Sequence, residues 1–122
     1  MLKDLDLTVT LKGKSGKDYV FKMYSFDEFS DLVSDITNNV AAIYLFTRRT
    51  VVNGEGRHDC IYLGETGDIS TRYSGHHKEA CITKHKANCI GFWWASTDEE
   101  KRRAAETDIL EANNFPCNEV NN

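Results

Sequence analysis

The sequence lacks the features of a membrane-spanning or unfolded chain. It has a single proline among 122 residues, and 40% of its residues are apolar. This length and composition are typical of one folded domain. No apolar run approaches the roughly 20 residues that a membrane-spanning helix needs, and the acidic, interrupted stretch at residues 1–6 does not resemble a signal peptide. We therefore expect a cytoplasmic protein without a membrane partner.

Paired cysteine motifs and a strong positive charge are also missing. The four cysteines are widely spaced and form no C-x-x-C pair; they are Cys60, Cys81, Cys89 and Cys117. In a reducing compartment this spacing favours small buried thiols, with a disulfide or a metal site as the alternatives. The formal net charge of -4 does not indicate a nucleic-acid binder. However, residues 44–103 carry 10 basic against 8 acidic side chains and all four histidines, which makes this segment either a solvated face or the part of the chain that meets an anion.

The first third of the chain predicts a β-β-α unit. Apolar and polar side chains alternate over residues 5–11 and 19–23, on either side of a glycine-bounded turn at residues 13–16. A period of two predicts a hairpin of half-buried strands. Ser25 and Glu28 then form an S-x-x-E capping box ahead of an apolar stripe, which predicts a short amphipathic helix ending near residues 38–39. We describe residues 1–39 as an N-terminal extension.

Residues 40–122 predict the order β-β-α-β-α. Buried strands are expected at residues 40–47 and 60–63, joined by a polar turn over residues 48–58 that contains Asn53 and Gly54. A helix is expected from Asp68 to residue 76, and a third strand at residues 89–95. A last helix would start at a capping box of Thr97 and Glu100 and stop before Pro116. The predicted fold is α+β, with a small antiparallel sheet flanked by helices in one compact domain.

Arg72 and His76 are the residues best suited to bind a phosphate. Four positions apart on a helix, they share one face, and their helix would start after a glycine turn, where free N–H groups favour an anion. The guanidinium can hold two phosphate oxygens, and the imidazole can transfer a proton near neutral pH.

Each candidate residue also has a structural explanation. Arg72 and His76 could be ordinary solvated helix residues, and Tyr44 and Tyr62 could be core aromatics of the predicted strands. Glu106 could form a surface ion pair with an arginine three or four positions before it on the helix.

The combination of these residues resembles the GIY-YIG nuclease superfamily. Ala42-Ile43-Tyr44 corresponds to the first signature, and Tyr62-Leu63-Gly64, eighteen residues later, corresponds to the second. The residues that follow in the family's order are Arg72, His76, Glu106 and Asn118. Members cleave DNA with one divalent metal ion, so the resemblance implies a GIY-YIG-like β-β-α-β-α core and a metal-dependent DNA endonuclease.

The resemblance also implies a role for each matching residue. Tyr44 and Tyr62, helped by His76, would activate and place the attacking water, and Arg72 would stabilise the charge that develops on the phosphate. Glu106 would hold the metal, Mg²⁺ or Mn²⁺. Asn118 would brace the site.

The chain departs from the family at a few points. Ala42 replaces the first glycine and Leu63 replaces an isoleucine, which are mild changes. Only residues 1–39 lie outside the resemblance, and no separate DNA-recognition domain is expected, so the preferred target stays unassigned. The oligomeric state is unassigned as well. The alternative function is a non-catalytic nucleic-acid-binding or assembly module that keeps the nuclease fold, although a decayed nuclease would be expected to lose Arg72 or Glu106.

Four potential zinc ligands recur at every fourth position: His77, Cys81, His85 and Cys89. One straight helix would spread them over about 18 Å, so they could not all bind one ion. A pair, either His77 with Cys81 or Cys81 with His85, could still bind zinc, and His77 or His85 could alternatively contribute to the nuclease site.

Overall fold

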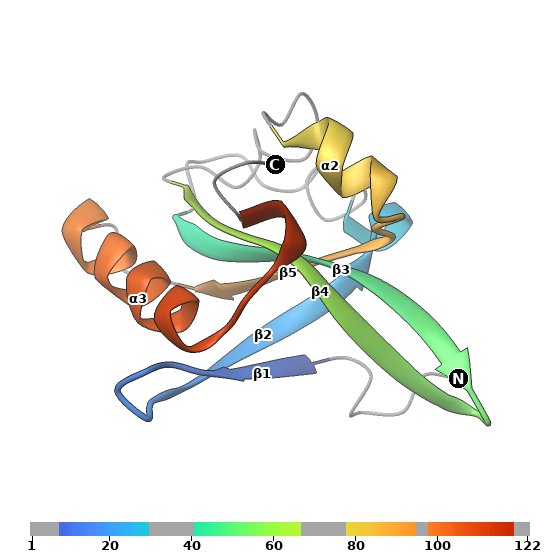
Figure 1. The fold of residues 1–122 in the computed structure, drawn as a ribbon, viewed down its shortest axis with the longest axis horizontal. Helices are drawn as coiled ribbons and strands as arrows, with labels where there is room; N and C mark the ends of the chain where they lie inside the picture. The colour runs from blue at the N-terminus through green and yellow to red at the C-terminus, as the bar shows by residue number, and fades with distance from the viewer. Residues whose placement is uncertain (1–7, 30–40, 67–77, 95–97, 119–122) are drawn as a thin grey trace.

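The computed structural model describes residues 8–29, 41–66, 78–94 and 98–118 (Figure 1). The elements, in chain order, are β1 (Thr8–Lys12), β2 (Asp18–Ser25), β3 (Ala42–Val52), β4 (Glu55–Thr66), α2 (Glu79–Lys84), β5 (Cys89–Trp94), α3 (Glu99–Ala112) and the 3-10 helix η3 (Pro116–Asn118). The strands form one antiparallel sheet in the order β1-β2-β5-β3-β4. The α+β class and the small antiparallel sheet are therefore confirmed.

The predicted N-terminal hairpin belongs to this same sheet. β2 pairs with β5, where Met23 lies opposite Gly91, so the extension continues the sheet of the later strands. The turn between β1 and β2 is fastened to α3, because the Asp108 carboxylate accepts hydrogen bonds from Ser15 N at 2.9 Å and from Ser15 Oγ at 2.7 Å. These bonds hold the pKa of Asp108 below its usual range, with the Ser15 hydroxyl as the largest cause.

The predicted capping box at Ser25 is present. Ser25 N donates to Glu28 Oε1 at 2.9 Å, and Glu28 N donates to Ser25 Oγ at 3.1 Å. These reciprocal bonds satisfy N–H groups that have no partner within the helix. Helical residues 26–29 follow, and Phe29 is fully buried; the rest of the predicted helix lies outside the described residues.

The β3–β4 hairpin is longer than predicted. Instead of a polar turn over residues 48–58, the strands stay paired up to Val52 and Glu55, and only Asn53 and Gly54 form the turn. Both turn residues have positive φ, 54° and 79°. This conformation suits a two-residue hairpin turn, whose twist matches the twist of paired strands. The pairing therefore extends to polar cross-strand neighbours such as Arg49 and His58.

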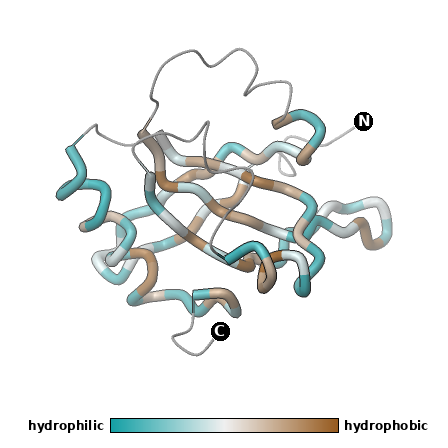
Figure 2. The backbone as a smooth tube through the Cα atoms, turned by 90° about the horizontal axis from the view of Figure 1, so that it is seen from above, coloured by the Kyte–Doolittle hydropathy of each residue, from teal (hydrophilic) through white to brown (hydrophobic). Residues whose placement is uncertain are grey.

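The sheet has a hydrophobic cluster on each face, and Figure 2 shows hydrophobic segments running through the middle of the molecule. The first cluster, which we call the tyrosine face, contains Phe29, Ala42, Tyr44, Phe46, Ile61, Tyr62, Ile82, Ile90, Phe92 and Cys117. The second, which we call the α3 face, contains Leu11, Tyr19, Phe21, Met23, Ile43, Leu45, Leu63, Cys89, Ile109 and Phe115. β3 contributes to both, which explains its unbroken run of buried residues from Ala42 to Thr47.

The last helix is close to its prediction. α3 ends at Ala112, before Pro116, but its N-cap is Asp98, whose side chain accepts a hydrogen bond from Glu100 N at 2.9 Å. Thr97, the predicted cap, lies outside the described residues. Ile109 is fully buried on the α3 face, so this helix packs against the side of the sheet away from the tyrosine cluster.

Candidate functional site

The β3–β4 hairpin brings the two signature tyrosines together. Tyr44 lies opposite Gly64, and Tyr62 lies opposite Phe46. Because alternate residues of a strand share a face, both rings lie on the tyrosine face, with their centroids 6.0 Å apart and their planes at 44°. Tyr44 is 1% exposed and Tyr62 is 8% exposed. The structure therefore joins the tyrosines to each other and also makes them part of the core.

Gly64 provides the space that the Tyr44 ring occupies. A Cβ atom at position 64 would overlap the phenol end of Tyr44, including its hydroxyl oxygen. Glycine is therefore required here because of a close side-chain approach, since any other residue would displace the ring. This contact gives a physical reason for a glycine at position 64.

Asn118 holds the neighbouring residue of β4 from outside the sheet. Leu63 N donates to Asn118 Oδ1 and Asn118 Nδ2 donates to Leu63 O, both at 2.8 Å. β4 is the last strand in the order of the described sheet, so its outward N–H and C=O groups have no strand beside them there. The amide of Asn118 satisfies both groups and fixes the backbone next to Tyr62.

Glu106 lies on α3, half-buried, and makes no hydrogen bond or ion pair with the described residues. Burial raises its pKa, and the nearby carboxylate of Glu65 raises it further, while Arg103 opposes the rise. The surface ion pair considered from the sequence is therefore not formed. Instead, Arg102 and Arg103 bind Glu65, with N–O distances of 3.1 and 3.7 Å.

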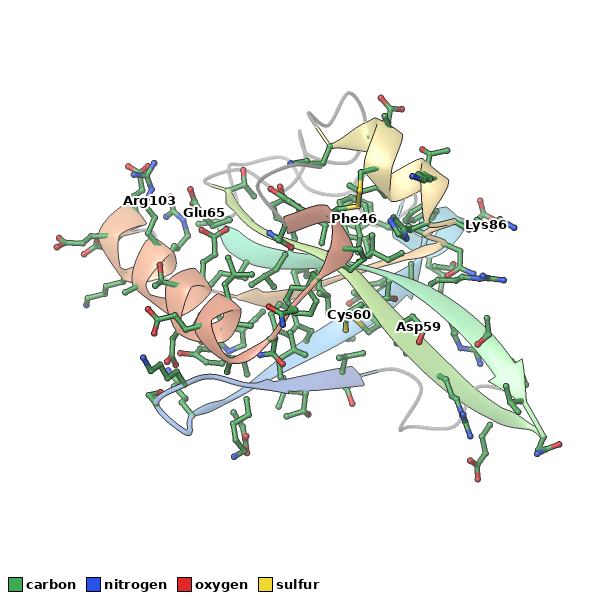
Figure 3. All side chains as sticks on the ribbon, viewed as in Figure 1. Phe46, Asp59, Cys60, Glu65, Lys86 and Arg103 are labelled. Carbon is green, nitrogen blue, oxygen red and sulfur yellow. A yellow bond between two sulfur atoms is a disulfide. The ribbon has the colours of Figure 1, made fainter. Side chains whose placement is uncertain are left out.

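Figure 3 shows Glu65 and Arg103 at the same end of the molecule, beside α3. Position 65 lies on the opposite face of β4 from positions 62 and 64. The Tyr44 ring therefore reaches β4 at Gly64 from one face, and Glu106 reaches it at Glu65 from the other. The described structure brings these side chains to consecutive residues of one edge strand, but it does not place Glu106 on the tyrosine face.

Three predicted site residues, Arg72, His76 and His77, lie outside the described residues. His85 is exposed and directly follows α2. It lies beside Cys81 and Cys117, because one ligand atom from each of these three residues lies within 4.8 Å of the others. His85 therefore belongs to a different cluster from Glu106.

The prediction of four buried thiols is wrong for two cysteines. Cys81 of α2 and Cys117 of η3 form a disulfide, which Figure 3 shows beneath α2. Sequence spacing did not reveal this pair because the two elements meet only in the folded chain. The other two cysteines are free; burial raises the pKa of the Cys60 thiol to about 11 and also raises that of Cys89.

The evenly spaced zinc-ligand stripe is also interrupted. α2 ends at Lys84, and Lys86 has a positive φ of 61°. Cys89 then starts β5 and packs on the α3 face, on the other side of the sheet from Cys117. Cys89 and Cys81 therefore do not share one helical stripe.

A hollow of about 390 Å³ lies beside the end of β2, and none of the described candidate site residues lines it. Its charged and ionisable lining residues include Glu28, Arg49 and His58. Arg49 and His58 face each other across the hairpin, and they were overlooked because the polar stretch around them was expected to be a turn. The short Asn53-Gly54 turn was the available signal, because it brings these two positions into register.

Among the described residues, no helix has both the length and the apolar character needed to cross a membrane. Comparisons with models of protein families, with curated proteins and with solved structures found no match to this chain.

Proposed function

We propose that this chain is a metal-dependent DNA endonuclease of the GIY-YIG type. The observation that carries the proposal is Glu106, a half-buried carboxylate without a hydrogen-bond or ion-pair partner among the described residues. It occupies the position that the signature order assigns to the metal ligand. Glu106 lies near Glu65 of β4. The Tyr44 ring lies against the preceding residue of that strand, Gly64, which leaves room for it.

The chemistry of Glu106 fits a hard divalent cation. A carboxylate oxygen is the ligand that Mg²⁺ and Mn²⁺ prefer, and a nearby cation would favour the ionised form that burial and Glu65 disfavour. Glu65 itself is paired with Arg102 and Arg103, whereas Glu106 has no ion-pair partner among the described residues and is the better placed of the two carboxylates to bind a metal. When bound, the cation would polarise the scissile phosphate and lower the pKa of a coordinated water.

The protein side chains would orient the reactants. The hydroxyl groups of Tyr44 and Tyr62 would hold the attacking water by hydrogen bonds, with His76 as the proton acceptor. Arg72 would place its charge against the non-bridging phosphate oxygens as the water attacks phosphorus and the leaving oxygen departs. Asn118 would keep β4 in place, because it fixes Leu63 beside Tyr62.

A second candidate is a nucleic-acid-binding or assembly module without catalytic activity. The observations that favour it are the burial of both tyrosines and the location of Glu106 at the opposite face of β4. Such a module would bind DNA without cleaving it.

The test is cleavage of supercoiled plasmid with Mg²⁺, with Mn²⁺ or with chelator. We expect nicking that depends on the metal and that falls by at least about 100-fold in Glu106→Gln, since even indirect partners of a metal ligand contribute about 10- to 100-fold. Arg72→Ala should be similarly inactive. Glu111→Gln is the matched control, because Glu111 is an exposed residue on the same helix, and it should cut like the wild type. Equal cutting by the wild type and Glu106→Gln would refute the proposal, whereas DNA binding without cutting would establish the second candidate.

A further inference from the structure

Cys81, His85 and Cys117 form a cluster that is separate from the proposed nuclease site. The three residues come from α2, from the position directly after it, and from η3. Their potential ligand atoms, two sulfurs and one imidazole nitrogen, lie within 4.8 Å of one another. None of them contributes to the roles proposed for Glu106 or the tyrosines.

The local structure fixes the spacing of these ligands. Cys81 and His85 are four positions apart, which brings them to the same side of the helix, and His85 N donates to Cys81 O at 3.1 Å. Ile82 anchors α2 in the tyrosine-face cluster. Cys117 is fully buried, and Asn118 ties η3 to Leu63 by two hydrogen bonds. Both elements that carry the cluster, α2 and η3, are therefore held in place by contacts that do not involve the sulfur atoms.

The ligand set suits zinc. In a tetrahedral site, Zn–S distances of about 2.3 Å and Zn–N distances of about 2.0–2.1 Å place the ligand atoms roughly 3.5–3.8 Å apart. The disulfide sulfurs would have to separate, and the imidazole would move closer by about 1 Å, which side-chain rotation can supply. Two thiolates and an imidazole prefer Zn²⁺ to Mg²⁺. Because His85 is exposed, the fourth position would be open to solvent water.

We propose that Cys81, His85 and Cys117 bind one zinc ion in the reduced protein, and that the Cys81–Cys117 disulfide replaces this site on oxidation. Both states join α2 to η3. The metal state needs both thiolates, so the two states exclude each other. Zinc occupancy would therefore report the redox state of the surroundings.

The oxidation can be written with a low-molecular-weight disulfide as oxidant. The Cys81 thiolate attacks one sulfur of that disulfide, which forms a mixed disulfide and releases one small thiolate. The Cys117 thiolate then attacks the Cys81 sulfur, which forms the protein disulfide and releases the second small thiolate. The two protein sulfurs lose two electrons, the added disulfide gains them, and Zn²⁺ is released.

The experiment compares metal binding by the reduced and the oxidised full-length protein. Co²⁺ is the spectroscopic probe, because thiolate ligands in a tetrahedral site give charge-transfer and d–d absorption bands. We expect one Co²⁺ per reduced chain, displacement of it by Zn²⁺, and loss of both metals after addition of oxidised glutathione. A reduced protein without thiolate-to-cobalt bands, or an oxidised protein that keeps the same zinc affinity, would overturn the proposal.

Variants assign the ligands. Cys81→Ser and His85→Ala should each weaken zinc binding. The zinc affinity of Cys81→Ser should fall by more than about 100-fold relative to the wild type, because losing a direct ligand should cost more than losing a residue that only supports a ligand. Cys60→Ser is the matched control, since Cys60 is a free cysteine on β4, and it should bind zinc like the wild type. Equal weakening in Cys60→Ser and Cys81→Ser would refute the assignment. The comparison of reduced and oxidised wild type does not depend on any variant folding.

Discussion

Substituting alanine for Asn118 is expected to weaken the fold at the outer edge of β4. The Asn118 amide makes two hydrogen bonds of 2.8 Å with the backbone of Leu63, whose side chain is fully buried. One hydrogen bond contributes about 1 kcal/mol net, and a buried group left without a partner costs about 1–3 kcal/mol. Water can reach part of an edge strand, so we expect a loss of about 2 kcal/mol in the free energy of unfolding.

This loss should be measurable by thermal or urea unfolding. A 122-residue domain with an unfolding entropy of about 2.1 cal/mol/K per residue loses about 4 °C of Tm per kcal/mol, so Asn118→Ala should melt about 8 °C below the wild type. Asn114→Ala is the control, because Asn114 is exposed and precedes η3 in the same segment; its Tm should change by less than about 2 °C.

Asn118→Asp tests the direction of the two bonds. The substitution keeps an acceptor for Leu63 N but places an oxygen against Leu63 O, which raises the pKa of the new carboxyl in the folded state. A carboxyl whose pKa is raised by folding stabilises the folded state at a pH below its unfolded-state pKa. This stabilisation is lost as the pH rises through the folded-state pKa. The deficit of Asn118→Asp relative to wild type should therefore shrink on acidification, whereas that of Asn118→Ala should stay constant. An Asn118→Ala protein as stable as the Asn114→Ala control would refute the role given to these bonds.

Three other perturbations have expected outcomes. Gly64→Ala should destabilise the protein by about 1–3 kcal/mol in urea unfolding, because the added methyl would overlap the Tyr44 ring; wild-type stability would show that the ring does not lie there. Glu106→Gln should gain stability relative to the wild type as the pH rises above the ordinary carboxyl pKa, because the raised pKa of Glu106 means that its ionised form destabilises the fold. Unfolding midpoints from pH 4 to 7 measure this difference in stability. A difference that does not change with pH would contradict the prediction. Reduction with a chelator present should cost about 3–4 kcal/mol, because the Cys81–Cys117 disulfide closes a loop with a sequence separation of 36. In the same melts, zinc should restore part of that loss, and no change on reduction would show that the disulfide does not form in solution.

Local sequence signals predicted much of the fold because their causes are local. The alternation around Val9 and Phe21 requires only that one side of each strand face a core, and both strands of that hairpin are present. The Ser25 and Glu28 capping box depends on atoms three residues apart, and it forms as expected. The start of α3 was harder to predict because Thr97 and Asp98 are both good caps, and backbone geometry decides between them.

The remaining features depend on tertiary arrangement. The polar residues beyond Thr47 resembled a loop, yet they pair because a two-residue turn at Asn53 keeps the strands in register. The Cys81–Cys117 disulfide depends on α2 and η3 meeting, which spacing along the chain does not reveal. Likewise, the order of Tyr44, Tyr62 and Glu106 along the chain does not reveal which face of the sheet is covered by the helix that carries Glu106.

The geometry of β4 limits where the proposed endonuclease reaction would take place, because the candidate residues lie on different faces of the sheet. Three consecutive positions of this strand are each contacted from a distant part of the chain: Leu63 by Asn118, Gly64 by Tyr44, and Glu65 by Arg102. At an interior strand, neighbouring strands would separate the two faces. β4 is the outer strand of the described sheet, so a substrate bound at its outer edge would meet both the Tyr44 side and the Glu106 side. Under the proposed function, the reaction would therefore take place at the edge of β4 at positions 64 and 65 and not on either face alone.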